Sequence, residues 1–433
     1  MWSHGTGSPK THGWMNAVVA SLLCIAPACQ ASPARVDALA LQDSTVPNDK
    51  GAAPERDPTH PLSTRENPER TDVMKLAPEI HGAELRAKAF LAYQRGFDYL
   101  VRTQNQDGSW GSHDPTMAWL RDFGFQTDNR GSQDGVRNAC TAIVAKALLR
   151  KTDRNPAEQN ALDKATEALL GTERFAYEMG EAFNTWGYGY KLDFLCDYLE
   201  TAAGNEDQER IAAAAKPCIE GLKRFQQADG GWNYYAGVMA GGESMSFNTA
   251  NFAEALFRAS RLGLEVPRGL FMDAAKLLQR MRTARGGVVY DARFILSGNS
   301  VNELSSASRT AAVIEALAEM NMVGPKELDH ALLTFNEGEN WLEDGRKLIQ
   351  PHTAVHQVSG YFFFYGYHYL SELMHRMGEA APVARWERNA WTMIRTQEED
   401  GRWWDTAAAD YGDKWGTGFA LLTLQRYLER CKE

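Results

Sequence analysis

The chain has 433 residues, of which 44% are hydrophobic and 24% are charged, as is typical of globular proteins. Its 46 Lys and Arg against 56 Asp and Glu give a net charge of −10, and no long basic block occurs. This balance argues against nucleic acid and against anionic membrane surfaces as partners.

The first 31 residues have the pattern of an export signal. Lys10 and His12 precede an apolar run at 14–25, and small residues at 28–31 offer a cleavage site. The run is too short for a permanent membrane span, and no other segment looks transmembrane. We therefore expect residues 1–31 to be a signal peptide and the mature chain to be exported, to the periplasm or the exterior, without an integral span. Lipidation of Cys29 is the less favoured alternative.

Residues 32–82 hold seven of the 16 prolines, many charges and few large apolar residues, which predicts a disordered linker. The cysteines beyond the signal show no CxxC spacing, which argues against a structural zinc site and a dense disulfide framework. One or two disulfide bridges, or buried free thiols at Cys140 and Cys196, both fit the pattern.

From residue 83 to residue 433 the apolar periodicity is helical almost throughout, with 287–290 as the best strand-like stretch. The pattern predicts six pairs of helices. First members are expected at 84–104, 157–171, 208–227, 269–283, 326–337 and 382–397, and second members at 134–150, 186–201, 246–262, 304–320, 357–376 and 415–430.

The two members of each pair differ in polarity. First members are amphipathic, as at 84–104, whereas second members are apolar nearly all round, as at 139–149. A helix that is apolar on every side is buried on every side. Six buried helices surrounded by six amphipathic ones predict an all-α fold, an α/α toroid. An open solenoid is the alternative, but its buried helices would keep a solvated stripe.

Three loops that follow first members share a Gln, then a Gly, then a Trp. Their Asp-Gly pairs start at 107, 229 and 400, and the separations of 122 and 171 residues correspond to two and three repeat units. A degenerate copy is expected at 341–345. The shared residues are Gln104, Gly108 and Trp110; Gln227, Gly230 and Trp232; and Gln397, Gly401 and Trp403.

With their preceding helices, these loops resemble the QW motif of squalene and oxidosqualene cyclases, whose repeat unit also occurs in protein prenyltransferase β subunits. The resemblance covers residues 84–433 and implies a toroid that holds an isoprenoid or other apolar ligand in its central cavity. Physically, the loop residues are structural. Gly permits the chain reversal, the Gln amide can satisfy backbone groups at the start of the next helix, and the Trp ring can cover that contact.

In such a toroid the inner helices are parallel, so their N-termini converge at one mouth, where they favour anions. Polar residues in these first turns are therefore site candidates, although most such residues cap helices. Candidate catalytic residues are Asp134, Glu303, Arg309, His356 and Asp413. Candidate ligand-binding residues are Arg137, Asn138, Trp186, Tyr188, Asn248, Tyr361, Tyr365 and Trp415.

Two signatures of the related families are missing. The chain has neither the Asp-x-Asp-Asp acid of squalene cyclases nor the Asp-x-Cys zinc ligands of prenyltransferases. His352 and His356 are four residues apart and form a weak candidate for a metal pair, without an identified third ligand. Asp193 and Asp197 offer an acid pair if they are buried, or ion pairs with a neighbouring helix. The sequence therefore predicts no particular cofactor and leaves catalysis open.

The aromatic run at 361–369 presents rings in every direction and, with Trp186 and Trp415, suits an apolar cavity. The same run fits equally well a toroid whose centre is simply filled by large aromatic side chains. Two other functions stay open. One is a non-catalytic toroid of the cell envelope that binds a protein or peptide at its mouth. The other is a carbohydrate-active barrel, with two acids drawn from Asp134, Glu303 and Asp413.

Overall fold

The structure is a computed structural model that describes residues 78–112, 130–171, 184–201, 207–234, 243–297, 303–347, 362–406 and 411–431. All of them belong to one compact unit, Pro58–Glu433. The described residues contain helices and no strand, and this holds also for the strand-like stretch at 287–290. That stretch forms only an isolated bridge, between Arg282 and Val288. No helix in the described part is long and apolar enough to cross a membrane.

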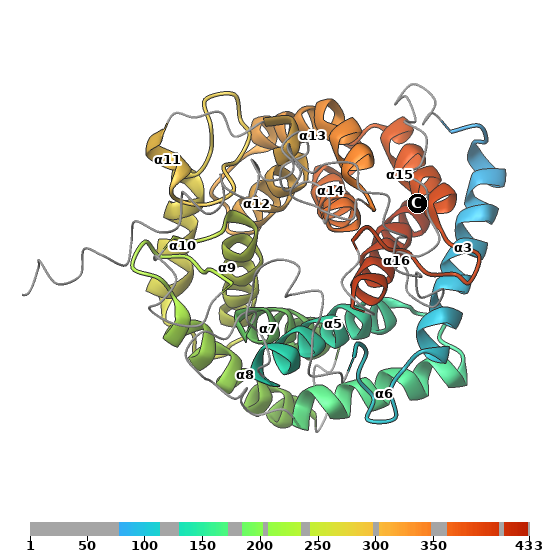
Figure 1. Ribbon diagram of the computed structural model, residues 1–433, viewed down its shortest axis with the longest axis horizontal. Helices are drawn as coiled ribbons and strands as arrows, with labels where there is room; N and C mark the ends of the chain where they lie inside the picture. Colours follow the sequence, from blue (N-terminus) through green and yellow to red (C-terminus); the bar gives the residue numbers. More distant parts are fainter. Residues whose placement is uncertain are drawn as a thin grey trace, which may run out of the picture. The chain divides into compact units, whose positions relative to one another are not determined.

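The described chain alternates outer and inner helices around a ring (Figure 1). The outer helices are α3 (Gly82–Arg102), α6 (Pro156–Gly171), α8 (Asp207–Phe225), α10 (Arg268–Arg280), α13 (Pro325–Gly345) and α15 (Val383–Thr396). The inner helices are α5 (Arg130–Arg150), α7 (Asn184–Thr201), α9 (Ser246–Arg261), α12 (Ala307–Glu319), α14 (Phe363–Met377) and α16 (Gly412–Arg430). Short elements are α11 (Phe294–Ser297), η2 (Glu303–Ser306) and η3 (Gly378–Ala380).

The inner ring is closed. Each inner helix packs against the next, and α16 returns to pack against α5. This confirms the all-α, α/α-toroid prediction and excludes the open solenoid. One predicted loop is wrong: residues 341–345 lie inside α13, which runs on to Gly345.

Burial explains the two helix classes. In the inner helix α12 every residue from Ala307 to Ala318 is buried, because its neighbours in both rings surround it. In the outer helix α10 only one stripe is buried, including Leu270, Ala274 and Leu278. Cys140 and Cys196 are buried free thiols, and no disulfide forms among the described cysteines.

The recurring loop clamps three helices together. In the first copy the amide of Gln104 donates to the carbonyl of Gly108, at 3.0 Å, and to that of Ala161 in the next outer helix, at 2.8 Å. The indole of Trp110 donates to the carbonyl of Leu100 at 2.8 Å, and its backbone N–H donates to Thr141 Oγ1, in inner helix α5, at 3.0 Å. The Gln amide thus reaches the next outer helix rather than the inner helix that the sequence suggested.

The other two copies repeat this geometry. Trp232 donates to Leu222 and Thr249, and Trp403 donates to Met393 and Thr417, with all four distances between 2.8 and 3.1 Å. The glycines Gly108, Gly230 and Gly401 have φ of +86°, +101° and +97°, a conformation that favours glycine.

The structure corrects the Gln of the second copy. Gln226, four residues before the glycine as in the other copies, donates to Gly230 O and Leu270 O, both at 2.7 Å. Gln227 instead donates to Phe225 O at 3.2 Å.

The third copy closes the ring. Gln397, after α15, donates to Gly401 O at 2.9 Å and to Ala92 O in α3 at 2.8 Å. Arg95 of α3 donates in return to the carbonyls of Glu398 and Glu399, at 3.0 and 2.7 Å. The last outer helix is therefore held to the first by the same contact that joins sequential neighbours.

Candidate functional site

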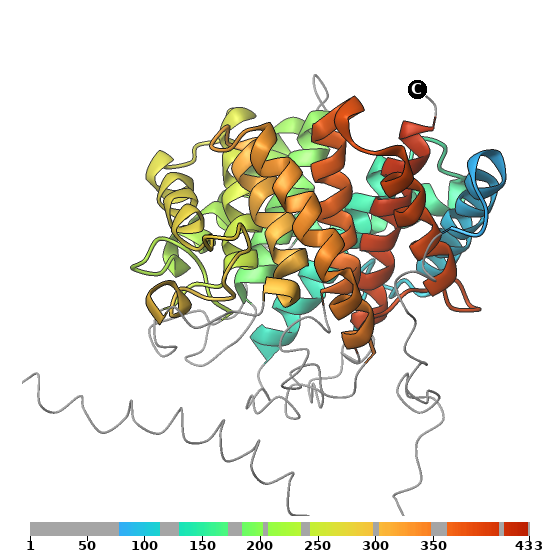
Figure 2. The same cartoon turned by 90° about the horizontal axis from the view of Figure 1, so that it is seen from above.

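The first turns of the inner helices lie at the same end of the ring (Figure 2), which we call the mouth. Along each inner helix, residues three or four apart face the lumen in successive layers. On α7 this stripe is Trp186, Tyr190, Asp193 and Asp197. The lumen therefore changes from aromatic at the mouth to ionic at the far end, which we call the floor.

Two half-buried tryptophans lie at the mouth. The rings of Trp186 (α7) and Trp415 (α16) meet edge to face, with centroids 6.3 Å apart. The Trp186 ring also lies 5.8 Å from that of Tyr234, and its indole donates to Asn248 Oδ1 at 2.8 Å. The hydrogen bond fixes the plane of the Trp186 ring, while part of its surface stays exposed.

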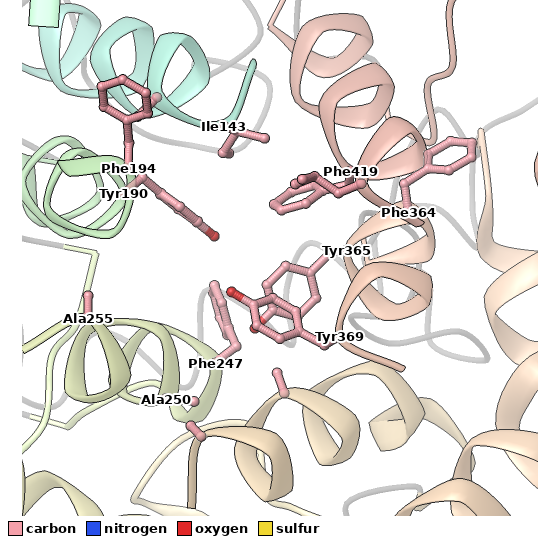
Figure 3. Close-up of a cluster of buried hydrophobic side chains, with 14 of the residues drawn as sticks. Ile143, Tyr190, Phe194, Phe247, Ala250, Ala255, Phe364, Tyr365, Tyr369 and Phe419 are labelled. Atoms are coloured by element: carbon pink, nitrogen blue, oxygen red, sulfur yellow. The ribbon is translucent and has the colours of Figure 1, made fainter. Parts of the chain in front are cut away.

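Below them lies a set of rings that we call the aromatic layer: Tyr190, Phe247, Tyr365, Tyr369 and Phe419. They come from α7, α9, α14 and α16 and point toward one another across the lumen (Figure 3). Ring centroids are 5.7 Å apart for Tyr365 and Phe419 and 6.4 Å apart for Tyr190 and Phe419.

Asn251 holds two hydroxyls of this layer in place. Its Nδ2 donates to the hydroxyl of Tyr190 at 2.9 Å, and its Oδ1 accepts from that of Tyr365 at 3.0 Å. The layer is thus both apolar and geometrically fixed.

Beneath the aromatic layer lies a cavity of about 30 Å³, which we call the chamber. It has room for one or two water-sized groups. Its lining residues are Lys146, Arg150, Gly189, Tyr190, Asp193, Asn251, Glu254, His368, Tyr369 and Glu372.

Two lining residues of the chamber are neutral at physiological pH. Burial, together with the neighbouring Glu315 carboxyl, raises the pKa of Glu254 well above its usual range, so Glu254 keeps its proton. Burial lowers the pKa of His368 to about 3, so its imidazole is uncharged. The His368 ring stacks on Phe419 at 5.4 Å. A protonated carboxyl beneath aromatic rings can donate a hydrogen bond or a proton, and the rings can stabilise positive charge.

Ion pairs form the floor of the lumen. Asp193 pairs with Lys146 at 2.5 Å and with Arg258 at 2.8 Å. Asp197 pairs with Arg258 and, at 2.7 Å, with Arg150. Although burial alone would raise it, these cations hold the pKa of Asp197 far below its usual range. Both aspartates are therefore engaged in ion pairs with neighbouring helices, the second of the two sequence readings, and do not form an acid pair.

The network continues across the floor to the last inner helix. Glu372 of α14 pairs with Arg150 at 2.9 Å and with Arg426 of α16 at 2.7 Å.

The predicted polar residues are engaged in structural contacts. Asp134 pairs with Arg137 in the first turn of α5, at 2.5 Å. Asp413 accepts from Tyr99 at 2.5 Å and from Lys414 at 3.3 Å, which places it between α16 and the outer helix α3. Arg309 is fully buried, donates to Ser305 O at 2.9 Å and lies 5.5 Å from the centre of the Tyr290 ring.

Tyr188 is a candidate that the structure contradicts. It stacks on Phe225, with centroids 6.2 Å apart, and contacts Gly221 of outer helix α8. Two residues along a helix turn the side chain by about 200°, so Tyr188 faces away from the side that carries Trp186.

Some predicted residues lie outside the described part. His352, His356 and Tyr361 fall between 347 and 362, and the side chain of Glu303 is likewise not described. Within the described ranges, no group of three His, Cys, Asp or Glu side chains is placed to bind a metal. Asn138 is buried in α5 and its Nδ2 has no hydrogen-bond partner among the described residues.

The sequence pattern does not single out Glu254 or His368 as site residues. One signal was present: Glu254 is the lone acid in the apolar stretch 252–257 of an inner helix, where burial should perturb it. His368 is hidden among aromatic residues, which suggest packing.

No family model matches the chain, and no curated protein does either. Among solved structures, a cellobiose 2-epimerase from Spirochaeta thermophila is 13% identical, with 82% of this chain and 100% of that one covered and a TM-score of 0.52. At this identity the likeness concerns the fold alone.

Two further structures are similar at a lower score. The type II terpene cyclase MstE from Scytonema, in complex with geranylgeranyl dihydroxybenzoate, is 14% identical, covering 81% of this chain and 99% of that one, with a TM-score of 0.47. A GH76A α-1,6-mannanase from Salegentibacter is 11% identical, covering 80% and 99%, with a TM-score of 0.45. The helical toroid itself follows from the closed ring of inner helices in this chain.

Proposed function

We propose that this protein binds an isoprenoid or similarly apolar ligand in its lumen, between the mouth tryptophans and the aromatic layer. The observation that carries this proposal is the convergence of rings from four inner helices (Figure 3), together with the half-buried Trp186 and Trp415 at the mouth.

The chemistry of the lumen favours an apolar body. A ligand that covers the exposed faces of Trp186 and Trp415 gains roughly 25 cal/mol per Å² of apolar surface removed from water. The hydroxyls of Tyr190 and Tyr365 are already bonded to Asn251, so a ligand that leaves these two rings in place displaces no hydrogen bond of theirs.

Fluorescence titration of the full-length protein with geranylgeraniol tests the proposal. Trp415→Ala should weaken binding about tenfold or more, because roughly 100 Å² of aromatic contact corresponds to about 2 kcal/mol. Trp391→Ala is the control: Trp391 is also half-buried, but it lies on outer helix α15. Equal loss in both variants, or no binding by the wild type, refutes the proposal.

The two alternatives are outcomes of the same titration. A carbohydrate site would show as binding of cellobiose or mannan oligosaccharides in place of the isoprenoid. Two of the acids predicted for a carbohydrate site already have partners: Asp134 pairs with Arg137, and Asp413 accepts a hydrogen bond from Tyr99. These contacts argue against a carbohydrate site. A peptide-binding mouth would show as retention of a peptide library by the wild type but not by Trp415→Ala.

The cellular location is part of the same proposal. We propose that residues 1–31 direct export and that 32–82 form a linker before the toroid. Cell fractionation and N-terminal sequencing of the mature protein test this, and a mature chain that keeps its first residues would contradict it.

A further inference from the structure

The chamber beneath the aromatic layer indicates which head group the ligand of the lumen carries. Building on the proposed function, we infer that the chamber binds a hydroxyl group, so that the ligand is an isoprenoid alcohol lying in the lumen with its hydroxyl toward the floor.

The size of the chamber is the first constraint on the head group of the ligand. The cavity of about 30 Å³ exceeds the roughly 10–15 Å³ that one water-sized group requires. A hydroxyl therefore fits this space.

Hydrogen-bonding capacity sets the second limit. Nδ1 of His368 is buried and has no hydrogen-bond partner within the described residues; the nearest carboxylate oxygen, Glu372 Oε1, is 3.9 Å away. A neutral imidazole and a protonated carboxyl each offer a donor and an acceptor, as does a hydroxyl. The polar atoms of Asn251 are already used by Tyr190 and Tyr365. The buried Nδ1 of His368 is therefore available to receive the ligand, whereas the carboxyl of Glu254 is hydrogen-bonded to that of Glu315.

Charge sets the third limit. The cations that line the chamber are already paired: Lys146 with Asp193, and Arg150 with Asp197 and Glu372. An anionic head group would have to break these pairs and lose its own hydration, which costs several kcal/mol per ion. A neutral hydroxyl has neither cost.

The separation between the aromatic layer and the chamber along the helix axis agrees with this orientation. Phe247 of the aromatic layer and Glu254 of the chamber are seven residues apart on α9, or roughly 10 Å along the helix axis. The rings and the chamber are therefore about two helical turns apart, a span that part of an isoprenoid chain covers.

The test compares ligands that differ only at the head. The full-length protein is titrated with geranylgeraniol, its methyl ether, the matching hydrocarbon and geranylgeranyl diphosphate. We expect the alcohol to bind about tenfold more tightly than the ether or the hydrocarbon, the scale of one net hydrogen bond, and the diphosphate to bind more weakly than the alcohol.

Two variants locate the contact. His368→Phe keeps a ring against Phe419 but removes both nitrogens, so the alcohol-to-hydrocarbon ratio should fall to about one while hydrocarbon affinity is retained. Glu254→Gln keeps a neutral donor and acceptor and should preserve the ratio. Retained hydrocarbon binding shows that each variant is folded.

The outcomes separate the two claims. If alcohol and hydrocarbon bind the wild type equally, or if the ratio persists in His368→Phe, the hydroxyl assignment is overturned while apolar binding stands. Tighter binding of the diphosphate overturns it as well, since the head would then lie outside the chamber. If neither the alcohol nor the hydrocarbon binds, the proposed function fails and the assignment with it.

Discussion

The register of the second loop can be tested with two adjacent residues. Gln226 and Gln227 are both half-buried, yet only Gln226 bridges outer helices α8 and α10, through hydrogen bonds of 2.7 Å to Gly230 O and Leu270 O. Each such bond contributes about 1 kcal/mol net. Gln226→Ala should therefore reduce the free energy of unfolding by about 2 kcal/mol.

Gln227→Ala is the matched control. It removes the same atoms, but its single side-chain hydrogen bond, 3.2 Å to Phe225 O, lies within the loop, so we expect a loss below about 0.5 kcal/mol. The free energies come from urea unfolding followed by circular dichroism, with unchanged m-values as the check on two-state behaviour. An equal or larger loss in Gln227→Ala would show that the bridging contact is assigned to the wrong residue.

Three further perturbations probe packing, the floor and pH dependence. Gly189→Ala should cost about 1–3 kcal/mol, since the new methyl group would overlap Phe252, while Gly171→Ala, with nothing within 4 Å, should stay within about 0.5 kcal/mol in the same urea assay. Arg258→Ala should cost about 3 kcal/mol because it removes a cation from the buried Asp197 and the half-buried Asp193, whereas Arg210→Ala breaks an exposed pair and should leave the free energy of unfolding nearly unchanged; similar losses would contradict the ranking. Burial raises the pKa of Asp405 to about 6 from 3.8, so the folded state binds its proton more tightly and this contribution to stability is lost as pH rises from about 4 to 6. Asp405→Asn should flatten the pH profile of stability there by up to about 3 kcal/mol, and an unchanged profile would refute the assignment.

The ring could be predicted from the sequence because inner helices are buried on every side and outer helices along one stripe only. The first kind of burial requires apolar residues nearly all round, and the second an amphipathic pattern. The inner stretch at 139–149 is apolar on nearly all sides, and the predicted end at 150 is where α5 ends. The prediction of a loop at 341–345 was wrong. The Trp and the Asp-Gly pair of this stretch resemble those of the recurring loop, although they continue α13, which ends at Gly345.

The site was less predictable, since direction around a helix matters as much as position along it. Trp186 and Trp415 were predicted from their place in the first turns and do lie together at the mouth. Tyr188 shares that place but faces the outer ring. The ion pairs of Asp193 depend on cations from α5 and α9, helices whose facing residues the sequence alone does not align.

The hydrogen bond from Gln397 to Ala92 joins the last outer helix to the first, so the outer helices have no distinct beginning or end in space. The order of helices around the ring equals their order along the chain, and the junction between α15 and α3 uses the same loop chemistry as the junctions from α3 to α6 and from α8 to α10. Packing alone therefore does not decide which hairpin comes first. A circularly permuted chain, opened between other hairpins, would retain every loop contact described here.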